Sequence, residues 1–154
     1  MSAAEQIREA RRRAGLTQAQ LARRCATSQA RLSTYESGRV VPTDQTLRRV
    51  LRAARPLPSE ALDAHVDEVH ALAAEHGLRN VRVFGSVVRG HDGWDSDIDL
   101  LVDPPDETGL RAVGVIAGFA DAASELLCVK VDVVADTWLK PLVAEAILAE
   151  AEPL

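Results

Sequence analysis

Residues 81–102 constrain the fold of this chain more than any other stretch, because they combine two short apolar runs with a glycine turn. Val81 to Phe84 is β-branched and aromatic, which is typical of a strand, and this run stops at Gly85. Gly85 permits a tight turn, and Ser86 opens the next segment with a hydroxyl and free backbone N–H groups. A second apolar run covers Ile98 to Val102. The stretch predicts strand, turn, short helix, loop and strand, and an anionic phosphate binds well at such a turn.

Two carboxylates stand at the head of the second run, at Asp97 and Asp99. Because strand side chains alternate, the two aspartates share one face while Ile98 and Leu100 point to the core. Neighbouring carboxylates on a strand repel each other unless a cation is held between them. Mg2+ prefers carboxylate oxygens together with substrate phosphates, so the pattern favours a divalent metal site.

These residues resemble the signature of a known family. Gly85-Ser86, then ten residues, then Asp97-x-Asp99 is similar to the signature of the DNA polymerase β nucleotidyltransferase superfamily. Phe84 before the turn, Arg89-Gly90 after it, and the run Ser96 to Leu100 resemble its minimal branch, the MNT domains. The spacing after Phe-Gly-Ser makes the match specific, whereas a lone Asp-x-Asp is weak.

A third acid lies in Cys128 to Val134, which alternates as a third strand. Valines 129, 131 and 133 share one face, which places Lys130 and Asp132 on the other. A charge flanked by valines usually marks the solvent face of an edge strand. The resemblance nevertheless implies that Asp132 is the third catalytic acid. Asp103 is an alternative, but two prolines follow it and a surface turn is expected there.

The mechanism implied by the resemblance is metal-dependent nucleotidyl transfer. Asp97, Asp99 and Asp132 would ligate two Mg2+ ions, with Asp132 also acting as base, and Gly85-Ser86 would hold the β and γ phosphates of ATP. Arg89 either touches the triphosphate or is a solvated loop residue. Trp94 is either a lid over the base or a stray exposed aromatic.

The charge distribution divides the chain into two parts. Residues 1–55 carry 12 Arg against four acidic residues, a formal charge of +8, whereas the remainder carries −13. The break falls at Arg55 to Pro58, where two prolines interrupt helical periodicity. We therefore expect a basic domain at 1–56, which meets nucleic acid, and an acidic domain at 59–154.

Composition limits the setting of the protein. No apolar run approaches the roughly 20 residues of a membrane span, and the N-terminus is polar. Cys25 and Cys128 lie in apolar-periodic stretches and are expected to be buried thiols in a reducing cytoplasm. The four His and two Cys show no zinc spacing.

Residues 4–54 predict four or five short helices. Ile7, Ala10 and Ala14 recur at helical spacing, and Gly15 ends that helix. Thr17-x-x-Gln20 has the form of a capping box before the second helix. A further helix starts near Ser28, with Leu32 and Tyr35 inward and Gly38 as its stop, and Thr43 or Asp44 caps the next one, with Leu47, Val50 and Leu51 on one face.

This part resembles the lambda-repressor-like (Xre-type) helix-turn-helix. The resemblance rests on Leu16 to Ala22, Ser28-Gln29, Tyr35 to Arg39 and Pro42. It implies that Ser28 to Tyr35 is the recognition helix, on which six residues are candidates to face the major groove: Ser28, Gln29, Ala30, Arg31, Ser33 and Thr34. Gln18 and Arg39 are expected to contact phosphates. A helical protein-docking module is the alternative, and the charge of +8 favours operator DNA, bound as a homodimer.

The turn of this motif departs from the usual pattern. The family has Gly and then an aliphatic residue there, whereas this chain has Ala26-Thr27. A positive φ at Ala26 would cost on the order of 1 kcal/mol relative to Gly.

The rest of the second part completes a small α+β domain. Ser59 to Gly77 predicts one amphipathic helix with Leu62 and Val69 on its apolar face, and a second helix runs from about Leu110 to Leu127. Pro141 opens a C-terminal helix. The fold class is therefore an all-α helix-turn-helix domain followed by an α+β nucleotidyltransferase domain with helices packed on a short mixed sheet.

The acceptor follows from length and resemblance. About twenty residues follow Asp132, so we expect no further domain for a tRNA, a primer or an antibiotic. Minimal MNT proteins resemble the antitoxin half of HEPN–MNT toxin–antitoxin pairs, in which AMP is transferred to a tyrosine of the HEPN ribonuclease. The chain is thus expected to be such an antitoxin that also represses its own operon. The alternatives are a repressor whose second domain only binds nucleotide or partner, and a small-molecule nucleotidyltransferase.

Overall fold

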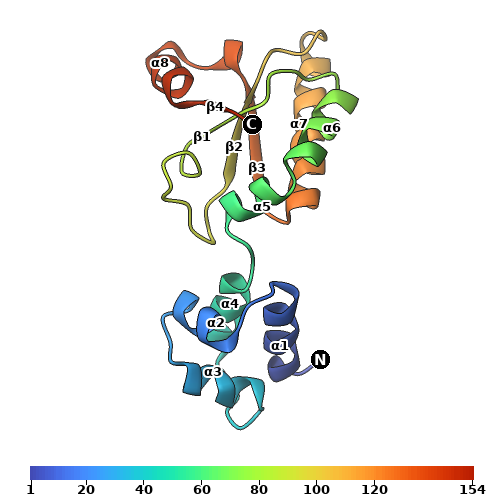
Figure 1. The fold of residues 1–154 in the computed structure, drawn as a ribbon. Helices are drawn as coiled ribbons and strands as arrows, with labels where there is room; N and C mark the ends of the chain where they lie inside the picture. Colours follow the sequence, from blue (N-terminus) through green and yellow to red (C-terminus); the bar gives the residue numbers. More distant parts are fainter. The chain divides into compact units, whose positions relative to one another are not determined.

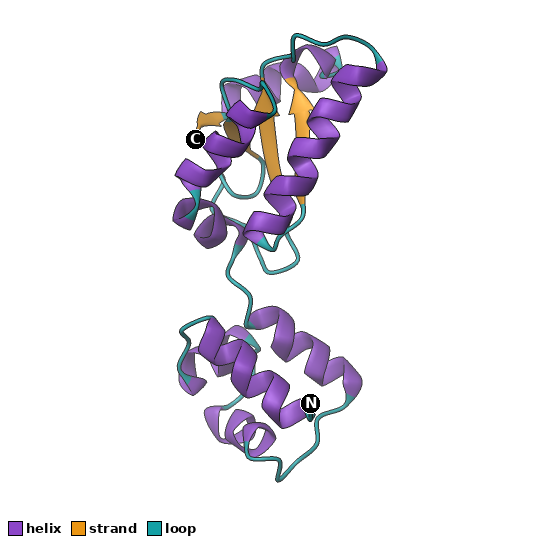
Figure 2. Cartoon of the chain, turned by 90° about the vertical axis from the view of Figure 1, so that its right-hand side faces the viewer, coloured by secondary structure: helices purple, strands orange, loops and turns teal.

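A computed structural model describes residues 1–154, which form two compact units, Met1–Pro56 and Leu57–Leu154 (Figure 1). The first unit is all helical, and the second combines helices with a four-stranded sheet. The strands occur only in the second unit, where helices stand in front of them in Figure 2. None of the helices has both the length and the apolar character needed to cross a bilayer.

The first unit contains α1 (Ala3–Arg13), α2 (Gln18–Arg24), α3 (Gln29–Glu36) and α4 (Asp44–Ala53). Each helix begins after a hydroxyl side chain that accepts a hydrogen bond from a backbone N–H of the first turn: Ser2, Thr17, Ser28 and Thr43. The predicted capping box is confirmed, because the Thr17 N–H also donates to the Gln20 side chain at 2.7 Å.

The core of this unit is a small set of aliphatic side chains, one or two from each helix. Ile7, Leu21, Leu32 and Val50 are fully buried, as the helical spacing predicted for Ile7, Leu32 and Val50. Burial of one such side chain contributes about 1.5–3 kcal/mol to the stability of the folded unit. These four side chains together therefore hold α1, α2, α3 and α4 in place.

A buried carboxylate locks α1 to the end of α3. Glu36 is 4% exposed, and its carboxylate accepts hydrogen bonds from Arg11 at 2.6 and 3.0 Å and from the Gln18 amide at 2.8 Å. Burial by itself would raise the pKa of Glu36, but the hydrogen bonds from Arg11 and Gln18 outweigh it and hold this pKa below its usual range. The charge is therefore kept ionised and paired inside the unit.

The turn between α2 and α3 contains a strained alanine. Ala26 adopts a φ of 52°, in the left-handed region that glycine occupies most easily. The departure from the family pattern at this position thus has the cost foreseen for it, on the order of 1 kcal/mol.

The second unit begins with α5 (Pro58–Ala64) and α6 (Val66–Glu75). The expectation of one continuous helix over 59–77 is wrong, because His65 between them has a φ of −133° and leaves the helical region. The apolar period continues across the break since Leu62 in α5 and Val69 in α6 are both buried in one core. The spacing of apolar residues shows which side of a segment is buried. Two consecutive helices that pack on the same core keep the same spacing, so it did not reveal the break between them.

The sheet consists of β1 (Arg82–Phe84), β2 (Ile98–Val102), β3 (Val131–Ala135) and β4 (Glu152–Pro153), in the order β3-β2-β1-β4. β2 pairs with β3 in parallel, whereas β1 pairs antiparallel with β2 and β4, so the sheet is mixed as predicted. The sequence did not indicate β4, because two residues after a helix carry no alternation. One sheet face packs on α7 (Leu110–Leu127), and the fully buried Phe119 of this helix belongs to the same apolar core as Ile98 and Leu100.

The end of α7 corrects a second expectation. Cys128 is exposed and has a φ of 53° as the left-handed cap of this helix, whereas it was expected to be a buried thiol. A capping residue points away from the apolar stripe that precedes it. Cys25 is buried as expected, and burial raises the pKa of its thiol.

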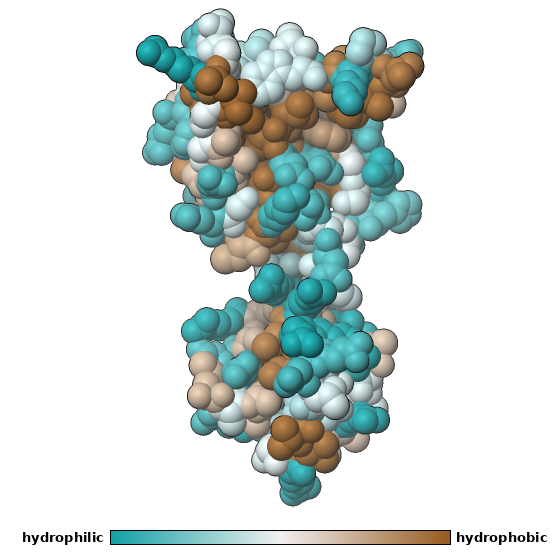
Figure 3. Space-filling view, turned by 180° about the vertical axis from the view of Figure 1, so that it is seen from behind, coloured by the Kyte–Doolittle hydropathy of each residue, from teal (hydrophilic) through white to brown (hydrophobic).

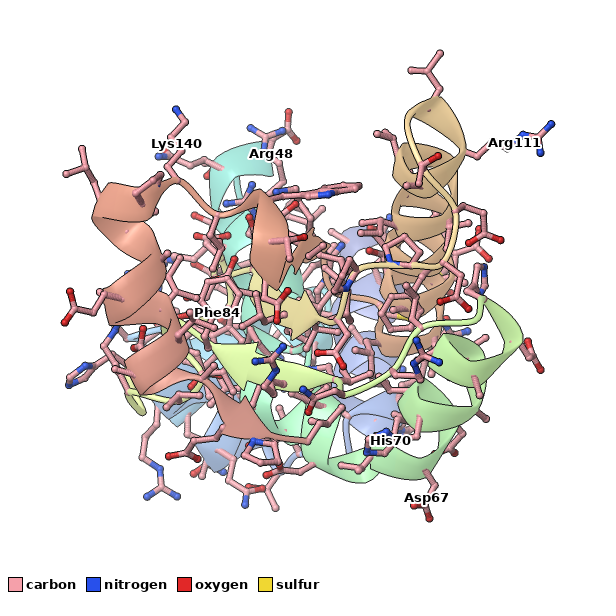
Figure 4. All side chains as sticks on the ribbon, turned by 90° about the horizontal axis from the view of Figure 1, so that it is seen from above. Arg48, Asp67, His70, Phe84, Arg111 and Lys140 are labelled. Carbon is pink, nitrogen blue, oxygen red and sulfur yellow. The ribbon has the colours of Figure 1, made fainter.

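After β3 comes a short 3-10 turn, η1 (Asp136–Trp138), and then α8 (Pro141–Glu150), which begins at Pro141 as predicted. Figures 1 and 4 show α8 on the other side of the strands from α6 and α7. None of its residues is buried, and Leu142 is 97% exposed. Figure 3 shows that hydrophobic patches on the surface of the chain are interrupted by hydrophilic side chains.

We predict that Ala26→Gly stabilises the first unit by about 1 kcal/mol, because glycine adopts the positive φ without a Cβ clash. In a unit of this size such a gain raises its melting temperature by about 4–8 °C, which calorimetry of the full chain can detect. Ala30→Gly is the matched control, since Ala30 is exposed within α3 and its replacement should lower stability by about 0.5–1 kcal/mol. A loss of stability in both variants would contradict the assignment of strain to Ala26.

Candidate active site

The three predicted acids meet where β2 and β3 begin and β1 ends. In the parallel register Asp99 lies opposite Asp132, and in the antiparallel register Phe84 lies opposite Asp99. Asp99 and Asp132 point away from the buried face of the sheet, since Ile98, Leu100 and Val131 fill that face. The structure therefore places residues 33 positions apart in sequence side by side on two neighbouring strands.

Asp97 and Lys130 occupy the next row toward the strand starts. The Lys130 ammonium donates to Asp97 Oδ2 at 2.9 Å and to Asp132 Oδ2 at 2.6 Å. Lys130 thus bridges two of the three acids across the two strands. Alternation had placed Lys130 on the face of Asp132, but sequence reasoning gave it no role, because only the register shows that it also faces Asp97.

The electrostatics of the acids reflect their crowding. Burial raises the pKa of Asp99, and the negative charges of Asp132 and Asp97 raise it further, while Lys130 and Arg89 act in the opposite direction. The hydrogen bonds to Asp132 and Asp97 raise the pKa of Lys130 above its usual value. Three carboxylates this close together repel one another, and a bound cation would relieve that repulsion.

Gly85 makes the close approach between the turn and the acids possible. Its φ is 78°, and a Cβ at this position would lie 2.5 Å from Asp99 Oδ2. Glycine is therefore required here both by the backbone conformation and by the carboxylate beside it. Ser86, half-buried, follows at the same turn.

The segment after the turn is shorter than predicted. Residues 85–90 form successive turns in place of the expected short helix. One helical hydrogen bond forms, from the Arg89 N–H to the Gly85 carbonyl at 3.2 Å, and Gly90 then takes a φ of 66°. A left-handed glycine ends a helix, so the segment stops after one turn.

Other candidates on this segment and on the neighbouring strands are placed as follows. Arg89 pairs with Glu150 of α8 at 2.9 Å, so it is neither fully solvated nor buried in the site. Trp94 is half-buried in the loop that leads to Asp97. Asp103 lies outside the cluster, because it pairs with Arg82 at 3.2 Å at the far end of β2.

The donor set fits a divalent cation in kind. Three carboxylates on adjacent strands supply the hard oxygen ligands that Mg2+ prefers, beside a turn suited to phosphate. No three His, Cys, Asp or Glu side chains form a ready-made metal centre in the structure. Two of the three carboxylates, Asp97 and Asp132, are instead hydrogen-bonded to the Lys130 ammonium.

The first unit presents the residues predicted to read DNA. Ser28, the cap of α3, and four residues of that helix are exposed, namely Gln29, Ala30, Arg31 and Ser33, while Thr34 is half-buried. Arg39 is exposed after α3. Gln18, expected to contact phosphate, donates its amide to Glu36 instead of standing free. Contact with DNA remains a prediction for all eight residues.

Gly85→Ala should separate the two requirements at this turn. The positive φ costs about 1–2 kcal/mol of stability, and the new Cβ displaces the Asp99 carboxylate, so nucleotidyl transfer should fall at least about 10²-fold. Gly90→Ala is the matched control, because Gly90 has a φ of 66° and nothing within 4 Å of its added Cβ. Thermal melts and transfer assays of both variants check this. Equal losses of transfer would show that the contact with Asp99 is unimportant.

Comparison with known proteins identifies both domains. Residues 68–152 match the family model described as a nucleotidyltransferase domain, and residues 2–72 match a helix-turn-helix domain. The chain is similar to the protein adenylyltransferase MntA of Thermococcus cleftensis (strain DSM 27260 / KACC 17922 / CL1), with 37% identity over 89 residues, which is 58% of this chain and 84% of the relative.

Solved structures give the same result. A minimal nucleotidyltransferase superposes with a TM-score of 0.54 and 43% identity, covering 62% of this chain and 95% of that one. A crystal structure of a toxin–antitoxin with AMP-PNP is more distant, with a TM-score of 0.48 and 20% identity over 56% of this chain and 69% of that chain, and has no bearing on function here. The family match over residues 68–152, together with the 37% identity to a protein adenylyltransferase, leads to one conclusion: the chain belongs to the nucleotidyltransferase family and carries a minimal nucleotidyltransferase domain behind an N-terminal helix-turn-helix domain.

Proposed function

We propose that this protein is an antitoxin that transfers AMP from ATP to a tyrosine of a HEPN-type ribonuclease toxin encoded beside it. The observation that carries the proposal is the cluster of three acids, Asp97, Asp99 and Asp132, beside the Gly85 turn. Its second support is the 37% identity to a protein adenylyltransferase across most of that relative.

The exposure of the acids supports a protein acceptor. The Asp97 and Asp132 side chains are 41% and 54% exposed, so the acceptor side of the site is open to solvent. An open carboxylate cluster admits a hydroxyl held on the surface of another protein, whereas a small acceptor is better held in an enclosed pocket.

Each residue has a role in the proposed reaction. Asp97, Asp99 and Asp132 would hold two Mg2+ ions, which neutralise charge on the triphosphate when bound. The backbone N–H groups at Gly85 and Ser86 would orient the β and γ phosphates, with Arg89 near them. The tyrosine oxygen bonds to the α-phosphorus, the bond from that phosphorus to the bridging oxygen breaks, pyrophosphate leaves, and Asp132 accepts the tyrosine proton. The added phosphate would place negative charge beside the toxin's site and repel RNA.

The test is a mass measurement. Mixing the full chain with its neighbouring gene product and Mg-ATP should add one AMP to a tyrosine of that partner, visible in intact-protein and peptide spectra. Asp99→Asn and Asp132→Asn should each slow the transfer at least about 10²-fold. Asp121→Asn is the matched control, because Asp121 is an exposed acid of α7 away from the cluster.

Two outcomes would redirect the proposal. A tight complex with an unmodified partner would mean that inhibition is by occlusion, and that the chain acts as a repressor without turnover. AMP found on a small molecule in place of the partner would favour a small-molecule nucleotidyltransferase.

The first unit would supply autoregulation in the same proposal. The charge of +8 over residues 1–55 and the exposed residues of α3 support binding of operator DNA in the major groove. One recognition helix reads too few bases for specificity, so a homodimer is proposed, with half-sites centred roughly 34 Å apart.

Salt and two substitutions test this binding. Affinity for the chain's own promoter should fall steeply between about 50 and 200 mM salt, because phosphate contacts release counterions. Gln29→Ala and Arg31→Ala should each relax base preference at one position by about 1–3 kcal/mol in footprinting or competition assays. Arg13→Ala is the control for Arg31→Ala, since Arg13 is an exposed arginine of α1 and its loss removes the same charge. Unchanged discrimination in the α3 variants would exclude it as the recognition helix.

A further inference from the structure

Lys130 lies where the acids of the proposed site would otherwise face a cation. Its Nζ is 2.9 Å from Asp97 Oδ2 and 2.6 Å from Asp132 Oδ2. These two carboxylates belong to different strands, and Lys130 is the ion-pair partner that each of them has in the structure. A positive charge shared between two carboxylates neutralises part of their mutual repulsion, which is the electrostatic role of a bound cation.

We propose that Lys130 is a built-in competitor of the divalent cation: its ammonium holds Asp97 and Asp132 in the metal-free protein and must leave them when metal binds. This inference rests on the proposed function only in that the acids are taken to bind metal. Under this inference Lys130 positions the Asp97 and Asp132 carboxylates before metal binds, and it takes no part in the transfer reaction.

The position of Lys130 suits both states. The residue immediately precedes β3, and its backbone carbonyl accepts from the Ile98 N–H at 2.9 Å, so its Cα is fixed to the β2 strand. The side chain is 63% exposed and has a flexible stem, so the ammonium can swing into solvent without disturbing the core. An arginine would form a bidentate pair with one carboxylate and leave less readily.

The strand register places Lys130 beside both carboxylates. Lys130 and Asp132 are two residues apart on one face, and the pairing of Ile98 with Val131 sets Asp97 opposite Lys130. Asp99 is half-buried and is not hydrogen-bonded to Lys130, and burial raises its pKa. A cation that enters beside Asp99 therefore meets one free carboxylate and two that Lys130 already holds.

The test measures metal binding directly, without turnover. Mn2+ titration of the full chain, with free Mn2+ followed by electron paramagnetic resonance, gives the affinity in the absence of nucleotide. Lys130→Met keeps the length of the stem and removes the charge, and we expect it to bind Mn2+ at least about tenfold more tightly than the unsubstituted protein. Lys140→Met is the matched control, because Lys140 is an exposed lysine at the start of α8 and its loss changes the net charge equally.

A second measurement guards against a misfolded variant. Without metal, Lys130→Met should melt at a lower temperature than the unsubstituted protein, because Asp97 and Asp132 are left without their bridging cation beside Asp99. Added Mn2+ should then raise its melting temperature by more than it raises that of Lys140→Met. Asp97→Asn combined with Lys130→Met should lose the gain in affinity.

The outcomes separate this inference from the proposed function. Mn2+ affinity in Lys130→Met that equals or falls below that of Lys140→Met would overturn the competition, even if AMP transfer to the partner is intact. A tenfold gain in affinity with no transfer would leave the competition standing and overturn the acceptor chemistry alone. Absence of Mn2+ binding in every variant would overturn the competition, while the transfer assay with Mg-ATP, in which the nucleotide brings the metal, decides the acceptor chemistry by itself.

Discussion

The parallel pairing of β2 with β3 is the constraint on which the candidate site depends. It sets Asp99 beside Asp132 and Asp97 opposite Lys130, and a shift of one residue would turn one strand's acids to the opposite face. The register is held by burial of Ile98, Leu100 and Val131 in the apolar core, since that face cannot slip without exposing apolar side chains. The packing of the core thus fixes the geometry of the charged face.

The carboxylates on the charged face of the sheet repel one another. Three carboxylates lie within two neighbouring rows, and burial together with Asp132 and Asp97 raises the pKa of Asp99. Lys130 neutralises part of this charge in the structure, and Gly85 lets the chain pass close to Asp99 Oδ2 without a side chain in the way. Under the proposed function these carboxylates face a metal and a triphosphate, so their mutual repulsion is a cost when neither is bound, and Lys130 lowers that cost with a side chain that can move aside.

The two units distribute charge between two kinds of partner. The arginine-rich first unit keeps its one buried carboxylate, Glu36, paired with Arg11 and Gln18, which leaves the exposed positive charge of the helices for a polyanion. The second unit is acidic, with a formal charge of −13 over residues 56–154, which disfavours a polyanion as its partner. Separate surfaces of opposite sign allow one chain to carry both a DNA-binding domain and a nucleotidyltransferase domain.

The sequence by itself determined the features that depend on local chemistry. Alternation predicted β2 and β3, the capping box at Thr17 predicted the start of α2, and the Gly85-Ser86 and Asp97-x-Asp99 spacing indicated the family. Only the tertiary structure decided what depends on contacts between distant segments. These are the bridge from Lys130, the break at His65, the pairing of β4 with β1, and the exposure of Cys128. The physical reason is that side-chain period records which face of a segment is buried, while register and packing, which no single segment contains, decide which neighbour it meets.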